Sequence, residues 1–467
     1  MPIIRSNAIE FDVSTQVAVI GAGACGFTAA IAAAEGGAEV MLIERDPRPH
    51  GSTGMSQGYV CAGGTRIQRE MGIEDDAELF YQDIMRKTNG LTDPVLARLV
   101  AERAGPTIDW LHDSHGVPFE VNPGWIAFGH SRPRMHGMPG KTGVELLTSL
   151  ERAAEAAGAI SCMGARVVDL YADETAAVTG LGLVRPDGRR ETIACEAVVL
   201  ATCGFGANRA MVAEHIPHMG KALYFGHEGN QGDGIAWGRE LGGALGDMAA
   251  YQGYGALTDH GVVLNYDVIM DGGFFINLAG RRFSDELADI SGQAEKLIAQ
   301  TDNTAWAIFG EAQRARVVDL PEFKDLTRLG AVRSADTIGA LAARIGVDET
   351  ALAQTLSEVE ALSKSGEPDG FGRRFVSGEA VSGPFCAVKV HGALFHTQGG
   401  LVVDGAARVR REDGDALPNL FAGGGAARSI SGPGVWGYLP AAGLCMATTL
   451  GRIAGENAAL LVARAPR

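Results

Sequence analysis

The clearest pattern of apolar and polar positions lies near the start of the chain. Residues 16–46 have the sequence QVAVIGAGACGFTAAIAAAEGGAEVMLIERD. The apolar runs 17–20 and 40–43 predict two buried strands, and the alanine-rich stretch between them predicts a helix. Strand, glycine-rich turn, helix and strand in this order predict a βαβ unit of the kind that binds dinucleotides.

The glycine spacing in this unit supports the same interpretation. Gly21, Gly23 and Gly26 have G-x-G-x-x-G spacing, and Glu44 directly follows the second strand. The first glycine allows a tight turn, the second lets the backbone approach a pyrophosphate, and the third lets helix and strand pack closely. The helix N-terminus then faces the phosphates, and Glu44 is expected to bind the ribose hydroxyls. This spacing alone does not separate FAD from NAD.

Later apolar runs predict how the chain is organised. An apolar strand and a glycine-containing turn recur in LATCGFGANRAMV (200–212), and again in LPNLFAGGGAARS (417–429). A chain that returns to its nucleotide domain near the C-terminus carries a large insertion. The polar helical run at 334–366 is placed in that insertion. The late return also favours a long, two-part cofactor.

Composition narrows the classes of function. The chain has 467 residues, too many for one ordinary core, and 65 of them are glycine. A net charge of −16 argues against a nucleic-acid partner or an anionic membrane surface. No apolar run approaches the roughly 20 residues that span a bilayer. The N-terminal residues lack the apolar region of a secretory signal. Seven cysteines without a CxxC pair predict reduced thiols in a cytoplasmic protein, and no metal site is predicted.

At these motifs the chain resembles the fumarate reductase and succinate dehydrogenase flavoprotein superfamily, which includes the 3-ketosteroid dehydrogenases. The resemblance covers nearly the whole chain, through GAGACG…ERD, GSTGMSQG, LATCGFGANR, GNQGDGIAWGRELGG, NLAGRRFSDE, HTQGGLVVD and LPNLFAGGG. It implies an α/β fold with a Rossmann-like FAD-binding domain split by an α+β capping domain. The expected boundaries are 1–250 and 376–467 for the FAD domain and 251–375 for the cap, with the active site where the two meet at the flavin ring.

The resemblance also implies which residues bind FAD. Superfamily members with covalent FAD carry a histidine where this chain has Ser52, and His50 lies two residues upstream, so non-covalent FAD is expected. The residues expected to bind the cofactor are Gly21, Gly23, Ala24, Cys25, Gly26, Glu44, Arg45, Gly51, Ser52, Thr53, Ser56, Gln57, Gly58, Val167, Ala201, Thr202, Gly232, Asp233, Gly423, Gly424, Gly443 and Leu444.

Three positions bear on the substrate. Fumarate and succinate enzymes carry a histidine in a QxHPT motif, where this chain has Tyr254. The arginine that follows their GxRFxxE motif would fall near Ile290 or Ser291, where this chain has no arginine. Their C-terminal arginine corresponds to Tyr438. Only the histidine of HTQGG, His396, is kept. The loss of the cations weakens a dicarboxylate interpretation.

Tyrosines at the corresponding places are what the ketosteroid dehydrogenases use. Desaturating a ketone removes an α-proton and transfers a β-hydride to flavin, and hydrogen bonds to the carbonyl oxygen stabilise the developing enolate. Tyr438 and the N–H of Ala442 or Gly443 are the candidate donors. Tyr254 is the candidate base. His396 is a further candidate, and Tyr59 is expected to face the same pocket.

The first hypothesis is therefore an FAD-dependent dehydrogenase that introduces an α,β double bond into a cyclic or 3-ketosteroid-like ketone. The expected electron acceptor is a quinone, oxygen or a carrier, with none identified by a residue. Alternatives are an alkene or enoate reductase of the fumarate type, and a flavin subunit that passes electrons to a partner. Simple packing remains an alternative role for Tyr254 and Tyr438.

Two other groups also have open roles. His130, Arg132, Arg134 and His136 could bind an anionic substrate group, the FAD pyrophosphate or only solvent. Glu286 is expected to make a buried ion pair at the domain interface.

Overall fold

The structure is a computed structural model that describes residues 3–5, 9–375 and 380–464. The chain forms two compact units, each built from segments that are distant in sequence. The first unit comprises Met1–His215, Gly226–Tyr251 and His396–Arg467, and the second comprises Ile216–Phe225 and Gln252–Phe395. The fold is α/β, with a Rossmann-like unit interrupted by a second unit of mixed helices and strands, as the sequence predicts.

The first unit contains a nine-stranded sheet with the order β1-β8-β9-β10-β2-β3-β7, to which β20 adds beside β10 and β19 beside β20. The strands β7, β3, β2, β10 and β20 run parallel to one another, whereas β9 and β19 pair antiparallel with β10 and β20. Their bounds are β1 (Ile3–Arg5), β2 (Val13–Ile20), β3 (Val40–Ile43), β7 (Ile160–Cys162), β8 (Arg166–Ala172), β9 (Val178–Val184), β10 (Arg190–Leu200), β19 (Arg408–Arg410) and β20 (Ala416–Ala422).

Short strands and helices complete this unit. The short strands form a sheet of order β4-β6-β5 and a pair β12-β18. Their bounds are β4 (Val60–Cys61), β5 (Glu120–Val121), β6 (Met135–Gly137), β12 (Leu245–Gly246) and β18 (Gly400–Leu401). The helices are α1 (Ala24–Glu35), α2 (Gly51–Gly54), α3 (Arg66–Glu70), α4 (Ala77–Lys87), α5 (Pro94–Asp113), α6 (Gly143–Ala156), α7 (Arg209–His215), α8 (Asp233–Glu240), η3 (Gly424–Ala426), η4 (Val435–Gly437) and α15 (Ala442–Arg464).

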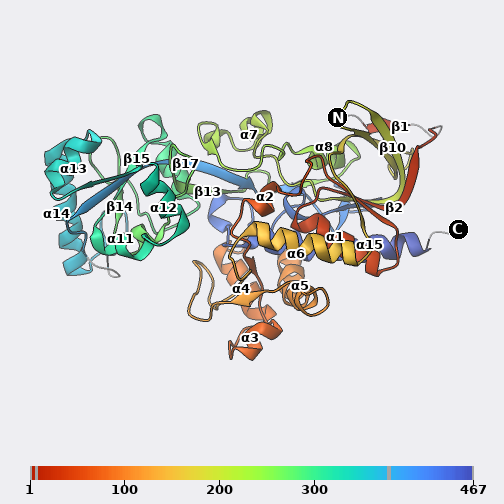
Figure 1. Cartoon of the computed structure of the whole chain (residues 1–467), viewed down its shortest axis with the longest axis horizontal. Helices are drawn as coiled ribbons and strands as arrows, with labels where there is room; N and C mark the ends of the chain where they lie inside the picture. Colours follow the sequence, from red (N-terminus) through yellow and green to blue (C-terminus); the bar gives the residue numbers. More distant parts are fainter. Residues whose placement is uncertain (1–2, 6–8, 376–379, 465–467) are drawn as a thin grey trace. The chain divides into compact units, whose positions relative to one another are not determined.

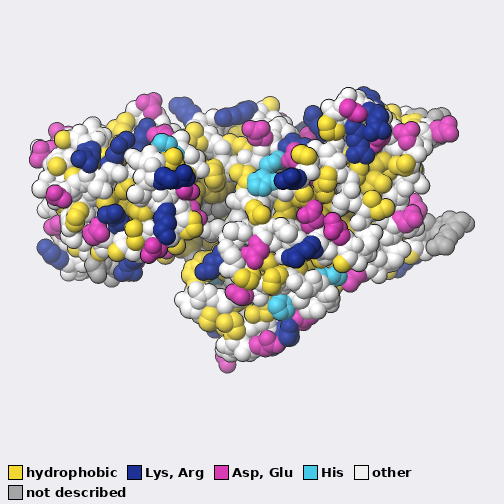
Figure 2. Space-filling view, viewed as in Figure 1, with side chains coloured by type: hydrophobic (Ala, Val, Ile, Leu, Met, Phe, Trp, Pro, Cys, Tyr) yellow, Lys and Arg dark blue, Asp and Glu magenta, His cyan; other side chains and the backbone are white. Residues whose placement is uncertain are grey.

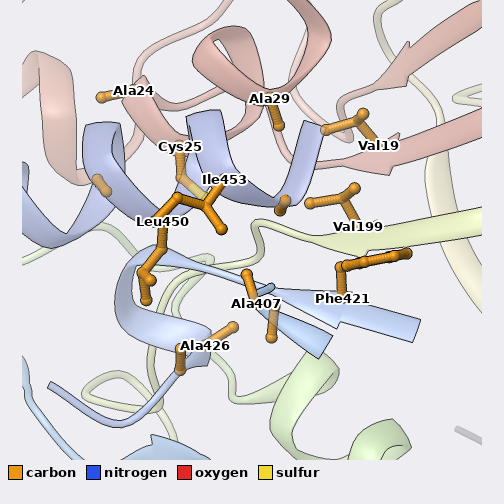
Figure 3. Close-up of a cluster of buried hydrophobic side chains, with 14 of the residues drawn as sticks. Val19, Ala24, Cys25, Ala29, Val199, Ala407, Phe421, Ala426, Leu450 and Ile453 are labelled. Carbon is orange, nitrogen blue, oxygen red and sulfur yellow. The ribbon is translucent and has the colours of Figure 1, made fainter. Parts of the chain in front are cut away.

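Close packing of α1 against α15 joins the two ends of the chain. A Cβ on Gly455 of α15 would lie 2.2 Å from the Ala29 carbonyl oxygen of α1, and one on Gly451 would lie 2.5 Å from that of Cys25. The helices can approach this closely only because α15 has glycine there. Figure 1 shows α1, α6 and α15 side by side. The buried side chains of Val19, Val199 and Phe421 lie in the same core (Figure 3).

The second unit is a sheet with helices on both faces. The strand order is β11-β17-β15-β14, and β13 and β16 also pair with β17. The strands are β11 (Leu223–Tyr224), β13 (Tyr251–Leu257), β14 (Phe274–Ile276), β15 (Ala305–Phe309), β16 (Val332–Ala335) and β17 (Phe385–Thr397). The helices are η1 (Pro217–Met219), α9 (Asp267–Met270), α10 (Gln293–Ile298), η2 (Thr301–Asn303), α11 (Glu311–Val317), α12 (Pro321–Arg328), α13 (Ile338–Ile345) and α14 (Glu349–Ser365).

Side-chain alternation along these strands builds two separate cores. Phe275 packs with Val317 and Phe323 from α11 and α12, whereas its neighbour Phe274 packs with Leu341 and Leu352 from α13 and α14. This is the period of two expected for a strand that is buried on both faces. Figure 1 shows these helices around β14, β15 and β17. The helical run predicted at 334–366 is two helices, because Gly346 ends α13 in the left-handed conformation.

The predicted boundaries differ from the observed units in two places. The second unit begins at Gln252, close to the expected residue 251, but it extends to Phe395 rather than ending at 375 and also takes in Ile216–Phe225. The reason is β17, whose residues from Phe385 onward pair with β15 and β16 and so belong to this unit's sheet. β11 pairs with β17 as well and brings the segment before it into the same unit.

Glu286 makes the predicted buried ion pair, but entirely within the second unit. Its carboxylate accepts hydrogen bonds from Arg373 at 2.7 Å and from Arg282 at 2.6 Å. The two arginines hold the pKa of this fully buried carboxyl below its ordinary value, against the opposing effect of burial. The ion pair therefore stabilises the fold of this unit.

None of the helices in the described ranges is long and apolar enough to cross a lipid bilayer. Figure 2 shows acidic and basic side chains interspersed over the visible face.

Candidate functional site

The turn between β2 and α1 has the geometry that a pyrophosphate requires. Gly21 has a φ of +107°, and a Cβ there would lie 2.5 Å from the Ala201 carbonyl oxygen. A Cβ on Gly26 would lie 1.7 Å from the Gly21 carbonyl oxygen, so neither position accepts a side chain. α1 begins at Ala24 after Gly23, which has no side chain to cap the helix. Gly23 thus leaves room for an anion at the start of α1.

Glu44 lies beside this turn, as predicted. One carboxylate oxygen accepts a hydrogen bond from the Ala22 N–H at 2.8 Å and the other accepts one from the Asp46 N–H at 3.0 Å. Each oxygen can accept more than one hydrogen bond. The carboxylate is therefore fixed in place and still able to bind ribose hydroxyls.

The segment at 51–58 lies beside Ala24, another predicted cofactor residue, and beside Asn230 and Cys203, which the sequence did not predict. The Thr53 hydroxyl accepts a hydrogen bond from the Ala24 N–H at 3.0 Å, so this segment is tied to the start of α1. The Ser52 hydroxyl accepts one from Asn230 at 2.9 Å and lies 3.4 Å from the Cys203 sulfur. Asn230, which lies within the GNQGDG motif, is a contact of the predicted cofactor residue Ser52 that motif reasoning missed.

The other predicted cofactor residues belong to the same unit. Ala201 and Thr202 follow β10, Gly423 and Gly424 follow β20, and Gly232 precedes α8. The carboxyl ends of parallel strands meet at one edge of a sheet, where such folds bind nucleotides. The Thr202 hydroxyl is buried without a hydrogen-bond partner in the described chain, which fits a group that a ligand satisfies. The remaining predicted residues are also in this unit: Arg45, Gly51, Ser56, Gln57, Gly58, Val167, Asp233, Gly443 and Leu444.

These features fit FAD. The anion-binding helix start, Glu44 and the glycine turns would hold the adenine dinucleotide half. The segment around Ser52 and Thr53 would hold further parts of the same cofactor.

A pair of rings forms a second group in the first unit. His396 and Tyr438 contact edge to face, with ring centroids 5.5 Å apart and an angle of 74°. Burial lowers the pKa of His396 to about 4, so the imidazole is neutral at pH 7. Burial, with a smaller contribution from Cys61, raises the pKa of Tyr438, and the N–H groups of Gly443 and Ala441 act in the opposite direction. Both rings are therefore neutral.

The two candidate backbone donors differ in availability. The Ala442 N–H donates to the Leu439 carbonyl at 3.1 Å, so this proposed substrate donor is already engaged. The Gly443 N–H lies near the Tyr438 hydroxyl, where it partly offsets the effect of burial on the pKa of that phenol. A Cβ on Gly443 would lie 3.3 Å from Cε1 and 3.5 Å from Nε2 of His396. Glycine at this position keeps space open beside the imidazole.

Gln398 and Ser431 also belong to this group, and the sequence analysis missed both. The Gln398 amide nitrogen lies 2.7 Å from Nδ1 of His396, and the Ser431 hydroxyl donates to the Gln398 amide oxygen at 2.9 Å. A polar residue two positions after His396 in HTQGG was the available signal. Ser431 had none, because only the tertiary structure brings it to the same place.

Tyr59 lies in the first unit and packs edge to face with Trp125, with centroids 5.2 Å apart. Burial raises its pKa. Its predicted place in the substrate pocket remains a prediction.

Tyr254 belongs to the second unit. Its hydroxyl donates to the Leu264 carbonyl at 2.8 Å, and its ring stacks on Phe395 with centroids 5.1 Å apart. Burial raises the pKa of this phenol, and Asp267 and Glu322 raise it further, while the Tyr266 N–H lowers it. These surroundings favour the neutral phenol, so a role as base requires the hydrogen bond to Leu264 to break.

The basic cluster at 130–136 is largely occupied by contacts within the protein. Arg134 is fully buried and pairs with Asp75 and Asp83, and the His136 imidazole lies 2.8 Å from the Thr65 hydroxyl. Arg132 donates to the main-chain carbonyls of Glu74 and Ser131. His130 lies 3.1 Å from the Pro440 carbonyl. These contacts favour a structural role over binding of an anionic substrate.

The βαβ turn, the parallel sheet and the open helix start define a dinucleotide-binding protein of the flavoprotein class. The chain belongs to the FAD binding domain family, whose model it matches over residues 16–445, and it falls within the fumarate reductase and succinate dehydrogenase flavoprotein superfamily. The proteins of this family bind FAD and act as oxidoreductases on carbon–carbon bonds, and the chain is an FAD-dependent oxidoreductase of this kind.

The proteins that this chain is similar to include both reductases and dehydrogenases. A probable fumarate reductase, Ifc3, from Shewanella frigidimarina is 30% identical over 452 residues, which cover 96% of this chain and 75% of the relative. A flavocytochrome c3 fumarate reductase in an open conformation superposes with a TM-score of 0.83 at 28% identity, over 97% of this chain and 79% of that one. A 3-ketosteroid-Δ4-(5α)-dehydrogenase from Rhodococcus jostii RHA1 gives a TM-score of 0.78 at 25% identity, over 98% and 99% of the two chains.

Proposed function

We propose that this protein is an FAD-dependent dehydrogenase that introduces an α,β double bond into a cyclic ketone, either a small ring or a 3-ketosteroid-like molecule. The observation that carries this proposal is the neutral pair of His396 and Tyr438. Two uncharged rings suit a carbonyl oxygen as acceptor. A dicarboxylate would favour cations at the same place.

The residues would act through the carbonyl oxygen. Hydrogen bonds from the Tyr438 hydroxyl and the His396 imidazole strengthen as negative charge develops on that oxygen when the α-proton leaves. Each preorganised donor of this type contributes about 2.7–4 kcal/mol to transition-state stabilisation. Bound FAD supplies a two-electron acceptor for the hydride that leaves the β-carbon. Tyr254 is the sequence's candidate for the base that takes the α-proton.

The surroundings of the ring pair support a neutral substrate group. Gln398 contacts His396, Ser431 contacts Gln398 and Cys61 lies near Tyr438, and none of these three side chains carries a charge. Arg428, on the same chain segment as Ser431, pairs with Asp247 at 2.6 Å and with Asp93 at 3.2 Å. Its charge is therefore neutralised within the protein. The similarity to a ketosteroid dehydrogenase over 99% of that chain's length agrees with this substrate class.

The test is anaerobic titration of the FAD-loaded protein while the visible absorption of the flavin is followed. Cyclohexanone-type ketones and 3-ketosteroids are expected to bleach the flavin, and succinate is not. Bleaching by succinate alone would contradict the proposal and indicate a dicarboxylate substrate. An exposed-site variant such as Gly405→Ala serves as the control, because a Cβ there meets no atom within 4 Å.

A second candidate is an enoate or alkene reductase of the fumarate reductase type. It is favoured by the relatives named fumarate reductases and by the retention of His396. In that case no ketone bleaches the flavin, whereas fumarate or another enoate rapidly reoxidises the dithionite-reduced protein.

A further inference from the structure

A short segment of the first unit, GHEGN at residues 226–230, contacts the chain on both sides of the nucleotide turn. We call this segment the strap. Nε2 of His227, in the strap, lies 3.1 Å from a carboxylate oxygen of Asp46. The same imidazole contacts the ring of His50 edge to face, with centroids 6.1 Å apart. One side chain of the strap thus touches two separate segments of the first unit.

These two segments are the ones expected to hold different parts of FAD. The Asp46 N–H donates at 3.0 Å to the Glu44 carboxylate, which is expected to bind the ribose hydroxyls. His50 directly precedes the segment 51–58, which is tied to the start of α1 and would hold further parts of the cofactor. His227 therefore bridges the segment at the adenosine end of the site and the segment that serves the rest of the cofactor.

The strap is held firmly at its C-terminal end. Asn230 is 4% exposed, its side chain donates to the Ser52 hydroxyl at 2.9 Å, and its carbonyl accepts from the Ala207 N–H at 3.0 Å. The Gly232 N–H, just after the strap, donates to the Gly204 carbonyl at 3.0 Å. Because the segment 204–207 follows β10, these bonds fix this end of the strap to the parallel sheet.

The other end of the strap depends on contacts that solvent reaches. The side chains of His227 and Asp46 are 20% and 29% exposed. The partly exposed guanidinium of Arg45 lies against Gly229, since a Cβ on Gly229 would be 2.7 Å from Nη1 of Arg45. Exposed contacts of this kind contribute little each, so they break more often than buried hydrogen bonds do. The strap therefore has one fixed end and one end that can be released.

We infer that the strap is a latch for FAD, which retains the cofactor while His227 contacts Asp46 and lets it enter or leave when that contact breaks. The inference requires FAD binding, but not the ketone chemistry of the proposed function. Both directions of exchange need the open strap, so loss of the contact raises the rate of FAD release and the rate of FAD binding together. A residue that only bound FAD directly would change release and leave binding as it is.

The test is the kinetics of FAD exchange in His227→Ala, Asp46→Ala and the double variant. Each single variant is expected to release FAD and to bind it about fivefold faster than wild type, the upper end for a partly exposed charged contact. The double variant should be no faster than the single ones, because both changes remove the same contact. Flavin fluorescence gives both rates, release after dilution of the loaded protein and binding after FAD is mixed with the FAD-free protein.

Two further variants within the strap sharpen the test. Glu228→Ala is the matched control, since it removes an exposed acidic side chain from the same segment, where the Glu228 main-chain carbonyl rather than the side chain accepts from Gln231. Its exchange rates should equal those of wild type. Gly229→Ala displaces the Arg45 guanidinium and is expected to raise both rates by about twofold, as loss of a weak exposed contact does.

Three results would overturn the inference. Unchanged exchange rates in both His227→Ala and Asp46→Ala would show that the contact does not limit exchange. Faster release with unchanged binding would make the two residues FAD ligands instead of a latch. A large fall in the melting temperature of the FAD-free variants would make the contact structural. None of these measurements uses a substrate, so they stand whether or not ketones bleach the flavin.

Discussion

Two tyrosines, one in each unit, share burial and a raised pKa but differ in what their hydroxyl groups meet. Tyr254 donates its proton to the Leu264 carbonyl at 2.8 Å. For Tyr438, the nearby N–H groups of Gly443 and Ala441 act against the rise of the pKa, and no hydrogen bond from its hydroxyl to an acceptor is found in the part of the chain that the structure describes. The Tyr254 hydroxyl thus already has an acceptor within its own unit, whereas the Tyr438 hydroxyl remains able to donate a hydrogen bond to a ligand. A raised pKa therefore does not by itself identify a reactive tyrosine, because the hydrogen-bond partner of the hydroxyl determines whether it can act on a substrate.

The largest effect is expected from Tyr438→Phe. It removes a donor from the developing enolate without changing the ring, so ketone-driven flavin reduction should slow by about 100- to 1,000-fold. Stopped-flow measurement of flavin bleaching under anaerobic conditions gives the rate. FAD binding and the melting temperature serve as controls and should change little. A rate within threefold of wild type would make Tyr438 a packing residue.

Gly443→Ala is expected to have an intermediate effect. The added Cβ would lie 3.3 Å from Cε1 of His396, so the imidazole has to shift by a few tenths of an ångström. We expect the same bleaching rate to fall by about tenfold, since small misplacement of catalytic groups is costly. Gly405→Ala is the control, in open space on the same unit. Equal rates for the two variants would show that His396 does not contribute.

Tyr254→Phe tests whether the tyrosine of the second unit is structural or catalytic. Loss of the hydrogen bond to Leu264 should lower the free energy of unfolding by about 1 kcal/mol. If the phenol is structural, as its contacts favour, the bleaching rate changes by less than tenfold. Urea unfolding and stopped-flow rates are measured on the same preparation. A thousandfold loss of rate with unchanged stability would establish Tyr254 as the base that the sequence predicts.

The smallest effect is expected from lowering the pH, which tests whether the buried histidines of the first unit are neutral. Burial lowers the pKa of His136 and His396 to about 4. Since the unfolded chain has a pKa of about 6.5, it binds more protons between these values, and stability falls as the pH drops from about 6.5 to about 4. Each histidine contributes about 1.4 kcal/mol per pH unit in this window.

Replacing either histidine should flatten that dependence. His396→Gln and His136→Gln are each expected to reduce the slope of unfolding free energy against pH between pH 6.5 and 5, measured by urea unfolding. An unchanged slope in His396→Gln would mean that this imidazole titrates in the folded protein as it does in the unfolded chain.

Local sequence was enough for the nucleotide half of the protein. Gly21, Gly26 and Glu44 act through turns, close backbone approach and a strand end, all of which are set within about 30 residues by steric rules that leave few alternatives. The family resemblance then supplied FAD and the divided α/β fold, which the structure and the relatives confirm. The end of the inserted unit was less predictable, because the pairing of β17 with distant strands sets it.

The sequence and its family resemblance thus determined the class of fold and the cofactor, and they predicted two tyrosines and a histidine in place of a cationic site. Only the tertiary structure decided what those side chains do. Ser431 donates a hydrogen bond to Gln398, which lies 33 positions earlier in the chain. The Ala442 N–H donates to the Leu439 carbonyl in a turn that no sequence motif predicts. A motif specifies which groups are present, but hydrogen bonds depend on a few tenths of an ångström and on direction. Those are fixed only when distant segments pack together.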